Sequence, residues 1–112
     1  MSAAGTTSWI DISADFAGYL ALPPMGRGPG LLLWQEIFGV NEHIRAVAEQ
    51  YALDGFVVLA PDIFWRSAPR VDLGYEGADR QQAMSLMQAY APDHASADIQ
   101  AGMCALRARP EV

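Results

Sequence analysis

The chain has 112 residues, a length typical of one domain, and its 52% hydrophobic and 18% charged residues exclude an intrinsically disordered protein. Its formal net charge of −6 argues against nucleic acid as a partner, because no basic surface is present to neutralise phosphates. All seven basic residues are arginines, which excludes chemistry that needs a lysine, such as a Schiff base or a P-loop.

Targeting signals are not evident in the sequence. The start of the chain lacks a basic residue followed by an apolar stretch, so we expect no signal peptide. No apolar run approaches the ~20 residues of a membrane helix. The single cysteine, Cys104, excludes an internal disulfide and fits a reducing compartment. We therefore expect a cytoplasmic protein with no membrane partner.

The first half of the chain predicts a hairpin followed by a strand and a helix. Short aromatic and apolar segments at 8–12 and 16–22 are typical of an antiparallel hairpin at a sheet edge. Residues 30–34 form a continuous apolar run, the pattern of a strand buried on both faces. Asn41 is the expected N-cap of a helix over 42–54, whose apolar stripe is Ile44, Val47, Ala48 and Tyr51.

The second half continues the α/β pattern. Residues 56–60 predict a second buried strand, which makes a parallel strand–helix–strand pair with the first. Residues 63–77 lack periodicity and are long enough to form a lid or a pocket wall. Two helices follow, one over 79–90 and one capped by Asp93, with predicted inner faces of Ala83, Met84, Met87, Tyr90 and of Ala97, Ala101, Cys104, Ala105, Ala108.

Glu36 is the first candidate for a functional residue. It follows the apolar 30–34 strand, and open α/β sheets bind ligands at the carboxyl ends of their strands. The spacing is equally compatible with a solvated loop charge or with a partner of the following helix dipole. A bound nucleotide is disfavoured, because the loop has a single glycine and Glu36 would repel an anion.

A specific resemblance appears in the segment that contains Glu36. The heptapeptide Gln35-Glu36-Ile37-Phe38-Gly39-Val40-Asn41 is followed in order by Leu59-Ala60-Pro61-Asp62-Ile63-Phe64 and by a helix with Arg80, Gln88 and Ala89. In these motifs the chain resembles the dienelactone hydrolase family of the α/β-hydrolase fold. The resemblance implies the N-terminal half of such a domain, three-layered as α/β/α, over residues 1–112, which would end before the nucleophile strand.

The resemblance also implies a reaction and residue roles. Family enzymes cleave a lactone or carboxylic ester with a cysteine on a Gly-x-Cys-x-Gly elbow, followed by an aspartate and a histidine, all beyond this chain. Glu36 corresponds to the glutamate that helps to deprotonate the thiol, and the backbone N–H of Ile37 to one oxyanion donor. Arg80 corresponds to the arginine that holds a substrate carboxylate, whereas Met84 replaces a tyrosine expected nearby. No metal or cofactor is implied.

Other candidates have simpler interpretations. We expect Cys104 to be a buried core thiol, Asp62 to form a turn, and His43 and His94 to be surface or capping residues. The alternative to an enzyme is an inactive fragment or interaction module that requires a C-terminal half or self-association. The contact would be made by the strand from Leu31 to Gln35, which lies at a sheet edge if no further strand covers it.

Overall fold

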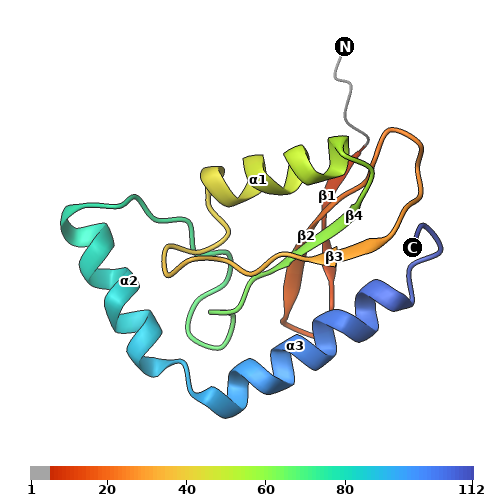
Figure 1. The fold of residues 1–112 in the computed structure, drawn as a ribbon. Coiled ribbons are helices and arrows are strands. Elements are labelled where there is room, and N and C mark those ends of the chain that lie inside the picture. The colour runs from red at the N-terminus through yellow and green to blue at the C-terminus, as the bar shows by residue number, and fades with distance from the viewer. Residues whose placement is uncertain (1–5) are drawn as a thin grey trace.

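The computed structural model describes residues 6–112 (Figure 1). Residues 1–5, on which the expectation of no signal peptide partly rests, lie outside the described part. The elements are β1 Thr7–Asp11, β2 Ala17–Ala21, β3 Gly30–Leu32, α1 Glu42–Leu53, β4 Val57–Pro61, α2 Gly77–Ala89 and α3 Pro92–Arg107. In the described part, no helix combines the length and apolar character that crossing a membrane requires.

The four strands form one mixed sheet in the order β1-β2-β4-β3. The predicted hairpin is confirmed, since β1 and β2 are antiparallel, with Trp9 opposite Tyr19. The predicted parallel pair is also confirmed, since β3 and β4 are parallel, with Leu31 opposite Val58. β2 joins the hairpin to β4 by an antiparallel ladder, so β4 is an inner strand.

Two helices cover opposite faces of this sheet and produce the expected α/β/α layers (Figure 1). Every residue of β4 is buried, and successive side chains turn to opposite faces. Val58 and Ala60 pack into the cluster beneath α1, whereas Val57 and Leu59 pack with Leu106 of α3. A strand covered by helices on both faces needs apolar residues throughout, which is why residues 56–60 lack alternation.

The expectation that the 30–34 strand is buried on both faces is wrong. β3 has three residues, and its side chains range from half-buried to exposed. Leu31 packs toward the α1 side and Leu32 toward the α3 side, but neither is fully enclosed. The reason is the position of β3 as the outer strand, with β4 as its neighbour on one side.

The N-cap of α1 is as predicted, but the inner faces of α1 and α2 are rotated from the expected ones. The Asn41 side chain accepts a hydrogen bond from the N–H of Ile44 at 3.1 Å, and α1 buries Ile44, Ala48 and Ala52. Tyr51, placed on the predicted stripe, is 42% exposed. In α2 the predicted Met84 and Met87 are 48% and 44% exposed, while Ala83 is buried.

The predictions for α3 are wrong in two respects. Pro92 occupies the first turn and Ala91 is the N-cap, so Asp93 does not cap the helix. The buried residues are Asp98, Gly102 and Leu106, whereas Cys104 is exposed. An apolar stripe does not reveal this face, because one member is an ion-paired carboxylate and another is a glycine that admits the side chain of Leu32.

Candidate active site

Glu36 and Ile37 lie in a tight turn, which residues 33–35 separate from the end of β3. The N–H of Gly39 donates to the carbonyl oxygen of Glu36 at 3.3 Å and closes the turn over residues 36–39. The side chain of Glu36 is exposed and Ile37 is half-buried. Within residues 6–112 no acceptor binds the N–H of Ile37.

Gln35 fixes the start of this turn from inside the protein. Its side chain is 6% exposed, and its amide nitrogen donates to the carbonyl oxygen of Glu36 at 2.9 Å. Its amide oxygen accepts a hydrogen bond from the N–H of Ile63, just after β4, at 3.1 Å. Gln35 therefore ties the ends of two neighbouring strands together. The sequence signal was a polar amide at the end of an apolar strand, and this role was missed.

Residues 71–75 pack along the turn as a short antiparallel partner. Gly39 forms a bridge with Asp72, and the N–H of Leu73 donates to the carbonyl oxygen of Phe38 at 3.0 Å. Gly39 has a φ of +89°, and a Cβ there would collide with the carbonyl oxygen of Val71. Glycine is therefore required, both for the backbone conformation and for the close approach.

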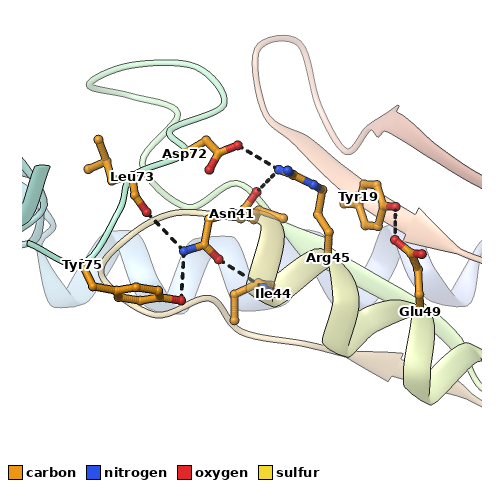
Figure 2. Close-up of polar contacts among 9 residues, drawn as sticks. Tyr19, Asn41, Ile44, Arg45, Glu49, Asp72, Leu73 and Tyr75 are labelled. Carbon is orange, nitrogen blue, oxygen red and sulfur yellow. Dashed lines mark hydrogen bonds and ion pairs between the residues drawn. The ribbon is translucent and has the colours of Figure 1, made fainter.

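Asn41 connects the turn, α1 and the 71–75 segment (Figure 2). Its amide nitrogen donates to the carbonyl oxygen of Leu73 at 3.3 Å and to the hydroxyl of Tyr75 at 3.2 Å. We refer to Asn41, Leu73 and Tyr75 as the Asn41 cluster. Beside it, the guanidinium of Arg45 donates to the carbonyl oxygen of Val40 at 2.9 Å.

A cavity of about 450 Å³ lies beside the Asn41 cluster, at the start of α1. It is lined by Asn41, Glu42, His43, Ala46, Asp72, Leu73, Gly74 and Tyr75. Part of the non-periodic 63–77 segment is therefore a pocket wall. His43 is exposed at the cavity, and within residues 6–112 no three potential metal-ligating side chains gather closely enough to hold an ion.

Arg80 lies on α2, away from these contacts. It is exposed, and within residues 6–112 its side chain makes no hydrogen bond or ion pair, so no polar contact joins it to Glu36 or Ile37. α2 is fastened at its two ends. At its start, the N–H of Gly74, which precedes the helix, donates to the side chain of Asp79 at 2.9 Å. At its end, the hydroxyl of Tyr90, which follows the helix, donates to the side chain of Asp98 at 2.8 Å.

Asp98 is the centre of a buried polar network. It is 1% exposed and receives two hydrogen bonds from the guanidinium of Arg66, at 2.9 and 3.0 Å. The indole N–H of Trp65 donates to it at 3.4 Å. Burial and the hydrogen bond to Asp98 raise the pKa of the Tyr90 hydroxyl far above its ordinary value. The network joins the loop after β4 to α3 and to the end of α2.

Asp62 closes the loop that leads to the 71–75 segment. One carboxylate oxygen accepts the N–H of Arg70 at 2.6 Å, and Arg70 adopts a left-handed φ of +50°. The other oxygen is buried and has no hydrogen-bond partner within residues 6–112. Burial raises the pKa of Asp62, partly opposed by the Arg70 contact. The contact agrees with the turn-forming role expected for Asp62.

Cys104 does not have the setting of an elbow nucleophile. Gly102 stands two residues before it, but Leu106 replaces the second glycine of the Gly-x-Cys-x-Gly pattern. The residue lies well inside α3 and not on a strand-to-helix turn. His94, in the first turn of the same helix, is half-buried and contacts Tyr90.

Comparison with known proteins finds one family over most of the chain. The model of the dienelactone hydrolase family matches residues 16–112. A carboxymethylenebutenolidase from a Pseudomonas species is 34% identical over 96 residues, which are 85% of this chain and 40% of the relative. Carboxymethylenebutenolidase 1 from Cupriavidus pinatubonensis is 31% identical over 96 residues, with 85% and 41% covered.

The fold has solved counterparts as well. The crystal structure of a dienelactone hydrolase-like promiscuous phosphotriesterase from metagenomic libraries superposes with a TM-score of 0.74 at 26% identity. The match covers 99% of this chain and 46% of that protein. The chain therefore spans about 40% of the length of the curated relatives it matches, and somewhat less than half of the solved structure.

Proposed function

The chain belongs to the dienelactone hydrolase family, and from this premise we propose that it forms part of a hydrolase that cleaves a lactone or a carboxylic ester. The observation that carries the proposal is the turn at 36–39. It presents the N–H of Ile37, which has no acceptor within residues 6–112, next to the exposed carboxylate of Glu36, and it contains a glycine at a position that leaves no room for a Cβ.

The two residues have distinct proposed roles. The N–H of Ile37 donates to the oxyanion that forms when the carbonyl carbon is attacked, where each such donor contributes about 10²–10³ in rate. Glu36 accepts the proton of a cysteine thiol, since a thiol of pKa ~8.5 is mostly protonated at neutral pH. The Gly-x-Cys-x-Gly elbow does not occur in the 112 residues. The proposal assigns the nucleophile to the part of the relatives that this chain does not span.

Arg80 is the proposed binding residue for a carboxylate on the substrate. Its guanidinium is exposed, and in the described part of the chain no acidic partner neutralises it. A guanidinium can hold a carboxylate through two parallel hydrogen bonds, which fixes the orientation of the bound molecule. With Met84 in place of a tyrosine, no neighbouring hydroxyl on α2 at that position assists it.

The test uses a chimera in which residues 16–112 replace the matching segment of the Pseudomonas carboxymethylenebutenolidase. We expect Glu36→Gln to lower kcat by about 10²–10⁴-fold, because an amide does not take the thiol proton. Glu76→Gln, the same change at an exposed glutamate that makes no capping bond, should leave kcat unchanged. Equal activity of the Glu36→Gln and parent chimeras would refute the role of Glu36.

Arg80 is tested with two substrates in the same chimera. Arg80→Ala should raise KM for a carboxylate-bearing lactone by about 10-fold or more, and have much less effect on a neutral p-nitrophenyl ester. Arg107→Ala, at the exposed end of α3, is the control. Equal losses on both substrates would remove Arg80 from the binding site.

The 112-residue chain alone should hydrolyse a p-nitrophenyl ester no faster than background, because an oxyanion donor without a nucleophile provides little catalysis. The exposed thiol of Cys104 makes this a sharp test. A burst of p-nitrophenol from the chain, abolished by Cys104→Ser, would make Cys104 a nucleophile and contradict the proposal.

A second candidate function, association through β3, is favoured by one observation. The N–H of Leu33 and the carbonyl oxygen of Pro29 bond to β4, at 2.9 Å each. Because backbone groups alternate along a strand, the N–H and C=O of Leu32 and Trp34 point away from β4. Residues 30–34 include neither a charge nor a proline that would block pairing. We propose that this edge takes a strand from a second copy or from the remainder of the larger fold.

Sedimentation velocity on two variants of the chain tests self-association. Leu32→Pro removes the outward N–H, whereas Leu32→Ala removes the same packing against α3 and keeps the N–H. We expect the parent chain and Leu32→Ala to associate as concentration rises, and Leu32→Pro to do so more weakly. A parent chain that stays monomeric at high concentration would exclude a second copy as the partner.

A further inference from the structure

We propose that Asn41 is a positioning residue for the 36–39 turn, and that it acts by holding residues 71–75 against that turn. The inference rests on the proposed function, since it concerns the orientation of the N–H of Ile37. Asn41 follows the turn by two residues, and its side chain makes contacts of its own rather than facing the proposed reacting groups.

The side-chain amide of Asn41 has a hydrogen-bond partner for its oxygen and for both of its N–H groups. It is 4% exposed, its oxygen accepts the N–H of Ile44, and its two N–H groups match two acceptors, Leu73 and Tyr75. The orientation of the amide is not arbitrary, because the N–H of Ile44 can only donate and the carbonyl of Leu73 can only accept. Aspartate would keep the cap of α1 but lose both donors, so the two roles of Asn41 are separable.

The contact with Leu73 reaches the turn in one step. Asn41 holds the carbonyl of Leu73, and the N–H of the same residue donates to the carbonyl oxygen of Phe38. On the other side of the turn, the N–H of Gly39 donates to the carbonyl oxygen of Glu36. With the carbonyls at 36 and 38 both fixed, the peptide planes between them have little freedom, and the first of these planes contains the N–H of Ile37.

Tyr75 provides a second connection between the same two segments. Its ring meets the ring of Phe38 edge-on, with centroids 4.4 Å apart and planes at 75°. Its hydroxyl accepts a hydrogen bond from the side-chain amide of Asn41 (Figure 2). Aromatic pairs in this geometry contribute about 0.5–1.5 kcal/mol beyond the area that they bury. The turn is therefore held by an amide and by a ring, both acting through the 71–75 segment.

Such fastening matters for an oxyanion donor more than for substrate binding. The donor acts on charge that develops in the transition state, and small displacements of a catalytic group lower the rate steeply. A loosened turn should therefore reduce kcat while KM stays nearly constant. If Asn41 served only as the N-cap of α1, kcat would not fall separately from KM, and Asn41→Asp would have no effect, because aspartate also caps a helix.

The structural arm of the test is amide hydrogen exchange on the 112-residue chain. In Asn41→Asp we expect exchange at Leu73 to rise by about 10–100-fold, because the hydrogen bond to the Leu73 carbonyl is lost and a carboxylate faces that carbonyl oxygen instead. Exchange at Ile44 should stay unchanged, since aspartate still caps the helix. Tyr75→Phe should raise exchange at Leu73 by a smaller factor. The matched control is Tyr19→Phe, which deletes the hydroxyl that binds Glu49 at the other end of α1 (Figure 2).

The catalytic arm uses the chimera. Asn41→Asp should lower kcat by about 10-fold with KM within about two-fold of the parent, as expected for a donor that is displaced and not deleted. Tyr19→Phe should alter neither constant. If Glu36→Gln has no effect, the proposed function fails, and the exchange arm then decides alone whether Asn41 fixes the turn. Unchanged exchange at Leu73 in Asn41→Asp, or a loss of kcat shared by Tyr19→Phe, would overturn the inference.

Discussion

The 36–39 turn and helix α2 both carry residues of the proposed site, yet several segments pack against the turn while α2 stands at the margin of the molecule (Figure 1). The turn is held by the buried side chain of Gln35, by the 71–75 segment and by the Asn41 cluster. In α2, Ala83 is the one fully buried residue, and polar contacts fasten the helix at its two ends.

This difference matches the proposed roles, in which the turn stabilises the oxyanion and Arg80 on α2 binds a substrate carboxylate. A group that stabilises a transition state benefits from a fixed orientation, because its effect depends on geometry within fractions of an ångström. A guanidinium that captures a carboxylate acts over a longer range and tolerates movement of its helix. The comparison therefore predicts that the same chemical change has unequal consequences in the two regions.

The largest effect is expected from glycine substitutions. Gly39 and Gly77 both have a positive φ, +89° and +63°. A Cβ at Gly39 would meet the carbonyl of Val71, whereas one at Gly77 would meet nothing within 4 Å. We expect Gly39→Ala to lower the free energy of unfolding by about 3 kcal/mol or more, from backbone strain and overpacking together. Gly77→Ala should cost about 1 kcal/mol. Urea unfolding measures both, and equal losses would contradict the contrast between the regions.

The next effect concerns the far end of α2. Tyr90→Phe removes a hydrogen bond to the buried carboxylate of Asp98 and should cost about 1–2 kcal/mol. Hydrogen exchange should accelerate along α2 and remain unchanged at Leu73, since phenylalanine keeps the ring on the hydrophobic cluster that Leu73 also contacts, and the hydrogen bonds of the two residues are separate. Tyr51→Phe, at an exposed tyrosine of α1, is the control. Faster exchange at Leu73 in Tyr90→Phe would show that the regions move together.

A pH titration addresses the loop that leads to the 71–75 segment. Burial raises the pKa of Asp62 above its ordinary 3.8, so the folded protein binds this proton more tightly than the unfolded chain does. The contribution of this group to the free energy of unfolding is largest below pH 3.8 and is lost as pH rises through the raised pKa. Asp62→Asn removes that loss, so its stability relative to the parent should increase as pH rises through this window. Asp15→Asn, at an exposed residue, is the control, and a difference that does not vary with pH would refute the assignment.

The smallest effect is expected from the ion pair beside the Asn41 cluster. Arg45 and Asp72 approach to 3.1 Å, but the Asp72 side chain is 51% exposed. A double-mutant cycle with Arg45→Gln and Asp72→Asn should give a coupling free energy of at most about 1 kcal/mol, reduced further by salt. A coupling well above that value would mean that charge, and not the Asn41 cluster, holds the 71–75 segment.

The sequence by itself determined the elements, their order and the region of the candidate site. Apolar runs and helical spacing predicted the hairpin, the parallel pair and three helices within a few residues, because local periodicity reports which segments bury a face. Asn41 was identified as the N-cap of α1, since its side chain accepts from a backbone N–H only three residues further along the chain. The heptapeptide that begins at Gln35 carried the family resemblance, which the family model confirms.

Tertiary structure alone decided which helix faces are buried and how the turn is held. Asp98 is buried because Arg66 lies 32 residues away in sequence and next to it in space, and no periodicity within α3 indicates that partner. Likewise, the second role of Asn41 depends on Leu73 and Tyr75, whose approach is set by a loop without regular structure. Polar contacts between distant segments are satisfied by geometry that local sequence does not encode, because a hydrogen bond requires its two atoms to meet and a pattern describes only one of them.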